Sequence, residues 1–297
     1  MLQAKKSFGQ NFLVSPHHLG LLDLAVESFL TQTKPAKIIE IGPGMGALTK
    51  IIIKNIDPAT PLECWEIDPE AVEYLKKTDY IDKIELIQRD ALEYLSHENK
   101  AKQNPPTPLT GGAEKGVQPV VAASLSRHEL AIAHKTLTDF VFISNLPYNV
   151  GSRILIEMVL QENKPLGFLV MLQKEVGQKL TAKEKNINLL GAFLRLFYDF
   201  KIVANFPRSA FSPQPKIESV LVQGLVKKDL KFNDAVLVLD TLKKLLIYPS
   251  KTLANNLKNL DWDKNKIDQF LAQNQLDKNI RLEWGNYIVL LESILRT

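Results

Sequence analysis

A short apolar segment that runs directly into a glycine-rich turn sets the strongest limit on how this chain folds. Residues 37–41 are expected to form a buried strand, the turn that follows carries Gly42, Gly44 and Gly46, and a helical pattern comes next. Glycines at such a junction let the backbone approach a ligand closely. The spacing is G-x-G-x-G instead of the dinucleotide-binding G-x-G-x-x-G, and no lysine follows, as a phosphate-binding loop requires. The turn therefore favours an adenosyl ligand without a pyrophosphate.

This apolar segment is one of several that alternate with helical patterns. Further strands are expected near residues 62, 84, 140 and 167, after an N-terminal helix from Pro16 to about Phe29. Alternation of this kind predicts a doubly wound α/β sheet. Two more strands, over Leu194–Ala204 and Ser219–Val226, are joined by a Pro-rich segment and predict a terminal antiparallel hairpin.

The pattern changes to helices alone after Val226. Four amphipathic segments without strands follow, over Asp234–Ile247, Lys251–Leu260, Lys264–Gln273 and Glu283–Leu295. We therefore expect an α/β domain over residues 1–226 and a small all-helical domain over residues 227–297. Within the first domain, the composition of residues 96–138 predicts a flexible surface insertion.

Acidic residues follow two strands at the sheet edge where the glycine turn is expected. Glu66 lies 20 residues beyond Gly46, the usual place for an acid that binds both hydroxyls of a ribose. The neighbouring Asp68 is better placed to cap the next helix. Asp90 ends the strand near residue 84, and it is expected either to accept from an adenine amine or to cap the helix that follows.

The apolar strand near residue 140 ends abruptly in Asn145-Leu146-Pro147-Tyr148. An amide, a backbone held extended before proline and an aromatic ring are what is needed to hold a flat base with an exocyclic amine. Asn145 Oδ1 and the Leu146 carbonyl can each accept one amine hydrogen, while the Tyr148 ring offers a face for stacking. A buried strand followed by an ordinary Pro turn explains this motif, taken alone, equally well.

Composition argues against several other kinds of site. Cys64 is the only cysteine, so no disulfide forms within the chain, no cysteine-rich metal site is possible, and a reducing compartment is expected. The five histidines show no metal-binding pattern, and we expect no metal. No apolar run approaches 18 residues and the N-terminus lacks the apolar core of a signal peptide, so we expect a cytoplasmic protein with no membrane partner.

In their order and spacing, these segments resemble the ribosomal RNA adenine dimethyltransferase family. Its members are class I S-adenosylmethionine-dependent enzymes that methylate N6 of two adjacent adenines in small-subunit rRNA. The matching segments span most of the chain: Lys5–Leu13, Glu40–Gly44, Glu66–Asp68, Asp90–Ala91, Asn145–Asn149, Leu172–Glu175 and Phe211–Ser219. The resemblance implies a Rossmann-like methyltransferase fold, a monomeric enzyme, S-adenosylmethionine as cofactor and rRNA of the small subunit or its precursor as partner. It also implies that the helical domain engages RNA.

The resemblance further implies roles for individual residues. Cofactor contacts are expected from Asn11, Leu13, Gly42, Glu66, Asp90 and Asn145. The implied catalytic residues are Asn145, Leu146, Pro147, Tyr148 and Phe211. Asn145 and Leu146 would orient the amine for direct in-line transfer, which requires no general base. Tyr148 and Phe211 would sandwich the flipped adenine, with a core aromatic in a Pro-rich connection as the alternative for Phe211.

Two segments depart from the family pattern. The insertion over residues 96–138 separates Asp90 from Asn145 by far more than the family's short connection, and it is expected on the side of the sheet away from the active site. Tyr248–Thr252 contains only Lys251 as a positive charge, where family members commonly carry arginines before the Lys-Thr pair. The helical domain therefore has less charge with which to bind RNA phosphates.

Three other functions share parts of this pattern. A related antibiotic-resistance class dimethylates large-subunit rRNA, but the segment Phe8–Leu13 and Leu146 favour the small-subunit function. A non-catalytic RNA-binding assembly or transcription factor could use the same fold, and the intact cofactor residues argue against it. A DNA adenine methyltransferase is disfavoured because such enzymes usually carry an acidic residue at the position of Asn145.

Overall fold

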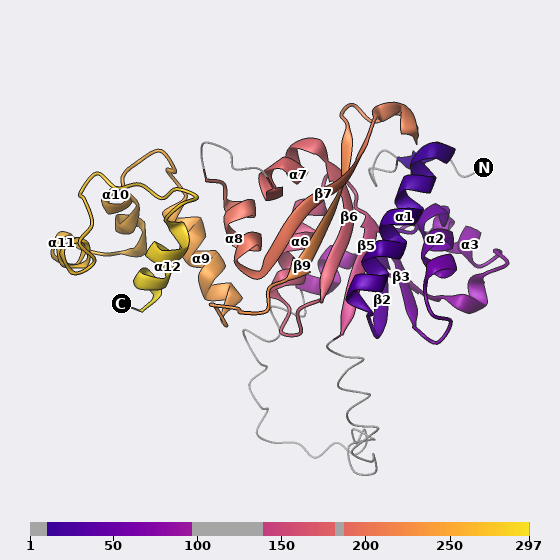
Figure 1. Cartoon of the computed structure of the whole chain (residues 1–297), viewed down its shortest axis with the longest axis horizontal. Coiled ribbons are helices and arrows are strands. Elements are labelled where there is room, and N and C mark those ends of the chain that lie inside the picture. The colour runs from indigo at the N-terminus through magenta and orange to yellow at the C-terminus, as the bar shows by residue number, and fades with distance from the viewer. Residues whose placement is uncertain (1–10, 97–138, 182–186, 297) are drawn as a thin grey trace, which may run out of the picture.

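A twisted seven-stranded sheet forms the centre of the molecule (Figure 1). The computed structural model describes residues 11–96, 139–181 and 187–296. In order across the sheet, the strands are β4 (Glu85–Gln88), β3 (Leu62–Glu66), β2 (Lys37–Ile41), β5 (Phe140–Asn145), β6 (Gly167–Gln173), β9 (Ser219–Val226) and β7 (Tyr198–Phe206). The first five are parallel, whereas β9 pairs antiparallel with both β6 and β7. The doubly wound sheet and its terminal antiparallel pair are therefore confirmed.

Helices cover both faces of the sheet, and each face has its own hydrophobic core. Because side chains alternate along a strand, Ile38 and Ile39 of β2 belong to opposite cores. Helices α1 (Pro16–Thr33) and α2 (Ala47–Asn55) bury apolar side chains on the face of Ile38. Helices α6 (Gly151–Leu160), α7 (Lys174–Thr181) and α8 (Leu189–Phe197) do so on the face of Ile39. The short α3 (Pro69–Leu75) follows β3.

One expected strand began too early. Residues 194–197 were expected in the last hairpin but belong to α8, and β7 begins only at Tyr198. The side chain of Asn188 caps this helix by accepting from the Gly191 N–H at 2.8 Å. Residues 194–197 are Leu-Arg-Leu-Phe, and a segment this short fits the end of a helix that begins at the Asn188 cap as well as the start of a strand.

A second, two-stranded sheet was not expected. Its strands are β1 (Phe12–Leu13) and β8 (Phe211–Ser212), which pair antiparallel with Leu13 opposite Phe211. The Ala210 carbonyl extends the contact by accepting from the Val14 N–H at 2.9 Å. This ribbon ties the start of the described chain to a segment about two hundred residues further on.

Only helices follow β9 in the part of the chain that the structure describes. They are α9 (Ala235–Leu245), α10 (Leu253–Leu257) with the short 3-10 turn η4 (Lys258–Leu260), α11 (Lys264–Gln273) and α12 (Tyr287–Leu295). In Figure 1 they lie beside α8, at the end of the molecule opposite α3. Their apolar residues join the same core as α8 and the sheet, so the division at residue 226 remains a prediction. None of the described helices is long and apolar enough to cross a bilayer.

The expected insertion lies almost wholly outside the described residues, which stop at Ser96 and resume at Asp139. Asp139 lies at the amino end of β5, where its carbonyl accepts from the Ala36 N–H at 2.6 Å, just before β2. The chain therefore enters β5 at the amino ends of the parallel strands. Glu66 and Asn145 lie at the opposite, carboxyl ends of β3 and β5.

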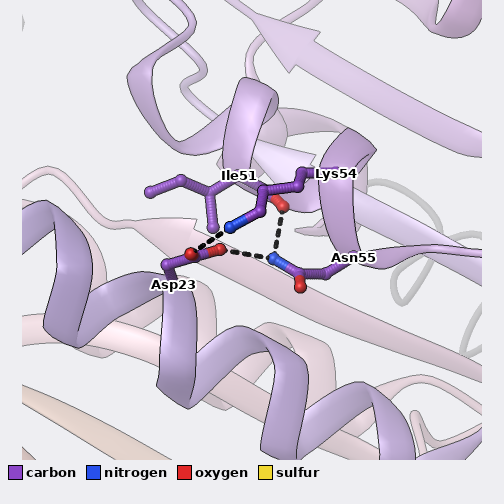
Figure 2. Close-up of polar contacts among 4 residues, drawn as sticks. All are labelled: Asp23, Ile51, Lys54 and Asn55. Carbon is purple, nitrogen blue, oxygen red and sulfur yellow. Dashed lines mark hydrogen bonds and ion pairs between the residues drawn. The ribbon is translucent and has the colours of Figure 1, made fainter.

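A polar cluster joins α1 to α2 (Figure 2). Lys54 Nζ donates to Asp23 Oδ2 at 2.5 Å, and Asn55 Nδ2 donates to Asp23 Oδ1 at 2.6 Å. The same Asn55 amide also donates to the Ile51 carbonyl at 2.9 Å. Both hydrogen bonds favour the ionised form of Asp23 and lower its pKa from the ordinary value of 3.8. The cluster therefore holds α1 against the helix that follows the glycine turn.

Replacing Asp23 by Ala is expected to lower the free energy of unfolding by about 1 kcal/mol, because two charge-assisted hydrogen bonds on the surface are lost. A group with a lowered folded-state pKa stabilises the fold above its unfolded pKa. The difference from wild type should thus be constant near neutral pH and vanish as the pH falls through the lowered pKa. Urea unfolding at several pH values measures this difference in stability.

Lys54→Met serves as the matched control, because it removes the bond from Lys54 and leaves the bond from Asn55 to Asp23 intact. Equal stability of wild type and both variants would contradict the prediction.

Candidate active site

A cavity of about 440 Å³ opens at the carboxyl ends of β2, β3 and β5. This is the edge at which open α/β sheets bind ligands. Nine of the expected site residues line it: Asn11, Leu13, Gly42, Glu66, Asp90, Asn145, Leu146, Pro147 and Tyr148. The structure therefore brings together residues spread over more than 130 positions of the chain, and of the expected set only Phe211 is absent from the lining.

The glycine turn forms one wall of the cavity, and its backbone needs residues without a side chain. Gly42, Gly44 and Gly46 have φ angles of 67°, 57° and 77°, in the left-handed region that glycine adopts freely. A Cβ atom on Gly44 would lie 3.1 Å from the Phe12 ring, and one on Gly46 would overlap the hydroxyl of Tyr80. The turn thus brings bare backbone to the cavity and leads into α2 at Ala47.

Glu66 is the last residue of β3 and is almost fully buried, with 3% of its surface exposed. Its Oε2 accepts from the Gly44 N–H and its Oε1 from the Asp68 N–H, both at 2.9 Å. Burial raises the pKa of Glu66 above its usual value, and the backbone N–H groups oppose that rise. Asp68 caps α3 by accepting from the Glu70 N–H at 3.0 Å, which confirms its expected structural role.

Asp90 follows β4 and caps the helical residues 91–96. Its Oδ1 accepts from the Leu92 N–H at 2.8 Å and from the Glu93 N–H at 3.2 Å. Asp90 therefore caps the helix, as one of the two expectations had it, and it does so with one carboxylate oxygen only. Because both bonds fall on Oδ1, capping is compatible with a ligand contact at Oδ2.

Asn145 ends β5, and its amide orientation follows from its partner. Nδ2 donates to the carbonyl of Asn11 at 3.2 Å, and only the amide nitrogen can donate to a carbonyl. The other end, Oδ1, is an acceptor. Next along the chain, the Pro147 carbonyl accepts from the Gly151 N–H at 2.9 Å, which turns the chain into α6. The phenol of Tyr148 forms a hydrogen bond with the hydroxyl of Ser219.

Phe211 is not brought to the cavity. Only 2% of its surface is exposed, and its ring packs in the core of the α1 face with its centroid 6.4 Å from that of Phe206. The register that places Phe211 opposite Leu13 holds it there. The core-aromatic alternative describes this arrangement, and stacking of Phe211 on a base remains a prediction.

Four residues in or next to the cavity were given no functional role by the sequence. Glu40 lines the cavity and is 1% exposed, and burial raises its pKa to about 8. Cys64 Sγ donates to Glu40 Oε2 at 3.6 Å. Arg89 also lines the cavity, with its guanidinium 4.0 Å from the ring centroid of Tyr94. The sequence could have indicated two of these residues, because Glu40 lies just before the glycine turn and Arg89 lies directly before Asp90. Ser219 had no local signal, since its partner Tyr148 is 71 residues away.

No group of three or more His, Cys, Asp or Glu side chains that could hold a metal ion occurs within the described ranges. The described polar residues that line the cavity are mostly acceptors: the acids Glu40, Glu66 and Asp90, the amides Asn11, Asn145 and Asn149, and the hydroxyl residues Ser144 and Tyr148, with Arg89 as the one cation among them. Such a set suits a neutral or cationic organic ligand with hydroxyl and amine donors.

The whole chain matches known proteins. A family model described as "Ribosomal RNA adenine dimethylase" matches residues 1–288. A relative from Helicobacter pylori strain P12, named "Ribosomal RNA small subunit methyltransferase A", is 31% identical over 100% of both chains. One of the same name from Treponema denticola is 31% identical over 94% of this chain and 84% of the relative.

Solved structures support the fold. A dimethyladenosine transferase from Plasmodium falciparum is 19% identical with a TM-score of 0.59, over 96% of this chain and 89% of the other. The 23S rRNA methyltransferase ErmE is 17% identical with a TM-score of 0.58, over 96% and 97% of the two chains. At these identities the likeness shows a shared architecture.

Proposed function

Because this chain belongs to the ribosomal RNA adenine dimethylase family, we propose that it methylates N6 of two adjacent adenines in small-subunit rRNA during ribosome assembly. It is a methyltransferase with an rRNA substrate. The observation that carries the proposal is the joint cavity, in which the glycine turn and acids of β2, β3 and β4 meet the Asn145–Tyr148 segment. One half suits an adenosyl cofactor, and the other suits a base with an amine.

The cofactor half fits S-adenosylmethionine. The volume of the whole cavity, about 440 Å³, lies within the range of small-molecule sites. In this proposal Glu66 accepts from the two ribose hydroxyls, and Asp90 Oδ2 accepts from the adenine amine. Asn11, Leu13, Gly42 and Asn145 complete this half. When bound, S-adenosylmethionine supplies an electrophilic methyl group on a sulfonium.

The base half prepares the amine nitrogen for attack. An adenine N6 lone pair is conjugated with the ring and is a weak nucleophile. Asn145 Oδ1 and the Leu146 carbonyl accept the two amine hydrogens, which directs the lone pair toward the methyl group. Pro147 holds the preceding backbone extended, and the Tyr148 ring supports the base. As the N–C bond forms, the bond between the methyl group and sulfur would break, and its electron pair would stay on the sulfur. The amine proton leaves to water after the transfer, so no general base is needed.

The remaining features are part of the same proposal. Residues 227–297 form the domain that engages RNA, and the enzyme acts as a monomer in the cytoplasm, where its rRNA substrate is assembled. Phe211 can meet a base only if the β1–β8 ribbon moves, because it is buried there.

The test is incubation of the purified protein with labelled S-adenosylmethionine and either undermethylated small ribosomal subunits or large subunits, followed by nucleoside analysis. We expect N6,N6-dimethyladenosine in small-subunit RNA alone. Label in large-subunit RNA would favour a resistance-type enzyme. Tight RNA binding without label in either subunit would favour a non-catalytic assembly factor and overturn the proposal.

A further inference from the structure

The hydroxyl of Tyr148 forms a hydrogen bond with a residue of a strand that is not adjacent to β5 in the sheet. Tyr148 lies in the turn after β5, and its phenol shares a hydrogen bond with the hydroxyl of Ser219, the first residue of β9. Ser219 has 0% of its surface exposed. The cavity-lining ring is therefore attached at its tip to a strand that lies two positions away from β5 in the sheet.

The Ser219 end of this bond is rigid. Ser219 pairs with Gln173 of β6 on one side and with Phe206 of β7 on the other. The preceding residue, Glu218, accepts at its carbonyl from the Lys174 N–H at 3.0 Å, and its carboxylate forms an ion pair with Lys174 Nζ at 2.7 Å. Strand pairing on both sides thus fixes the backbone of Ser219 and leaves its hydroxyl only the rotation about one short side-chain torsion.

The Tyr148 end has much less support from its own backbone. The turn is closed by the Pro147 carbonyl, which accepts from the N–H groups of Val150 at 3.2 Å and Gly151 at 2.9 Å. These bonds fix the turn but not the two side-chain torsions of Tyr148, which set the plane of the ring. Burial raises the pKa of Tyr148 further above neutral pH, so the phenol keeps its proton and can donate to the Ser219 hydroxyl or accept from it.

We propose that Ser219 is a positioning residue for the methyl transfer: its hydroxyl fixes the plane of the Tyr148 ring, and this fixed plane aligns the target adenine for both transfers. The inference rests on the proposed function. The ring contacts the base, whereas Ser219 acts only through the ring.

The second transfer depends more strongly on this alignment than the first. A monomethylated amine has one hydrogen left for the two acceptors, Asn145 Oδ1 and the Leu146 carbonyl, so stacking must supply more of the orientation. A ring released at its tip should therefore slow the second step more and let monomethyladenosine accumulate.

The test is a double-mutant cycle of Ser219→Ala, Tyr148→Phe and the two combined. Each single variant is expected to lower the rate of the second transfer by roughly three- to tenfold and to raise the ratio of monomethyl- to dimethyladenosine. The KM for S-adenosylmethionine should not change. Because both changes remove the same bond, the double variant should be no slower than the slower single variant.

Thr33→Val is the matched control, since it removes a hydroxyl that donates to the Phe29 carbonyl at 2.8 Å on α1, outside the cavity. It should leave both rates and the product ratio unchanged. Multiplicative losses in the double variant, or a lower melting temperature of Ser219→Ala with an unchanged product ratio, would overturn the positioning role.

A readout that needs no turnover separates this inference from the proposed function. In protein labelled with [¹³Cε]tyrosine, the Tyr148 signal is assigned by its loss in Tyr148→Phe. Ser219→Ala should average and sharpen that signal as the ring gains freedom, and an unchanged signal overturns the anchor. If wild type transfers no methyl group while the signal still responds, the proposed function fails and the anchor stands.

Discussion

Replacing Asn145 by Ala is expected to abolish detectable methyl transfer, with a fall in kcat of at least about 10³-fold. The variant removes the side-chain acceptor that turns the amine lone pair toward the methyl group. It also removes the donor to the Asn11 carbonyl, which ties the N-terminal segment to the end of β5. Binding of rRNA should weaken only modestly, because phosphate contacts dominate RNA affinity. Single-turnover methylation and filter binding on the same subunits measure the two effects.

Asn145→Asp tests separately the acceptor and the donor that Asn145→Ala removes together. Aspartate keeps an acceptor oxygen at the same position but cannot donate to the Asn11 carbonyl. We therefore expect activity between those of wild type and Asn145→Ala. If Asn145→Ala still produced dimethyladenosine at the wild-type rate, Asn145 could not be the residue that orients the amine.

Replacing Glu66 by Ala should weaken S-adenosylmethionine binding by roughly 1–3 kcal/mol, or about 5- to 150-fold in Kd. The variant removes the acceptor for the ribose hydroxyls and leaves the N–H groups of Gly44 and Asp68 without their partner. Isothermal titration calorimetry gives the affinity, and thermal unfolding of the ligand-free protein gives the cost of the two lost backbone bonds. An unchanged calorimetric Kd would contradict the ribose assignment.

Glu66→Gln shows how much of the cofactor affinity depends on the negative charge, because it keeps the size of the side chain and one acceptor oxygen.

The pH dependence of cofactor binding by the wild-type protein tests the same charge. Burial raises the pKa of Glu66 above 4.5, and hydroxyl donors favour its ionised form. Cofactor affinity should thus be full above this raised pKa and fall as the pH decreases through it, with a proton released on binding. Glu66→Gln should lack that pH dependence.

Much of the fold could be predicted because its signals are local. The strands at 37, 62, 84, 140 and 167 are short apolar runs bounded by turns, and all five were confirmed. The strand expected from Leu194 failed at its first four residues, because so short a segment, with Arg195 as its one polar residue, fits the end of a helix as well as the start of a strand. The β1–β8 ribbon was missed because two-residue strands carry no periodicity at all.

The site shows the same division between local and distant signals. Glu66 and Asn145 could be placed at one edge because both end parallel strands. The capping bonds of Asp90 were foreseen as an alternative, since a helix pattern follows it directly. Burial of Phe211 and the contact between Tyr148 and Ser219 depend on how β8 and β9 return to the cavity, which no local pattern encodes.

The β1–β8 ribbon also determines how much of the chain must be synthesised before the site can assemble. Leu13 has its partner only after Phe211 has been made, and Tyr148 has its partner only after Ser219. A nascent chain that already contains the glycine turn, Glu66 and Asn145 still lacks the strand that holds its N-terminal segment in place. The chain must therefore be made as far as Ser219, nearly three quarters of its length, before the first residues of the cavity settle, so shorter chains do not carry the finished site.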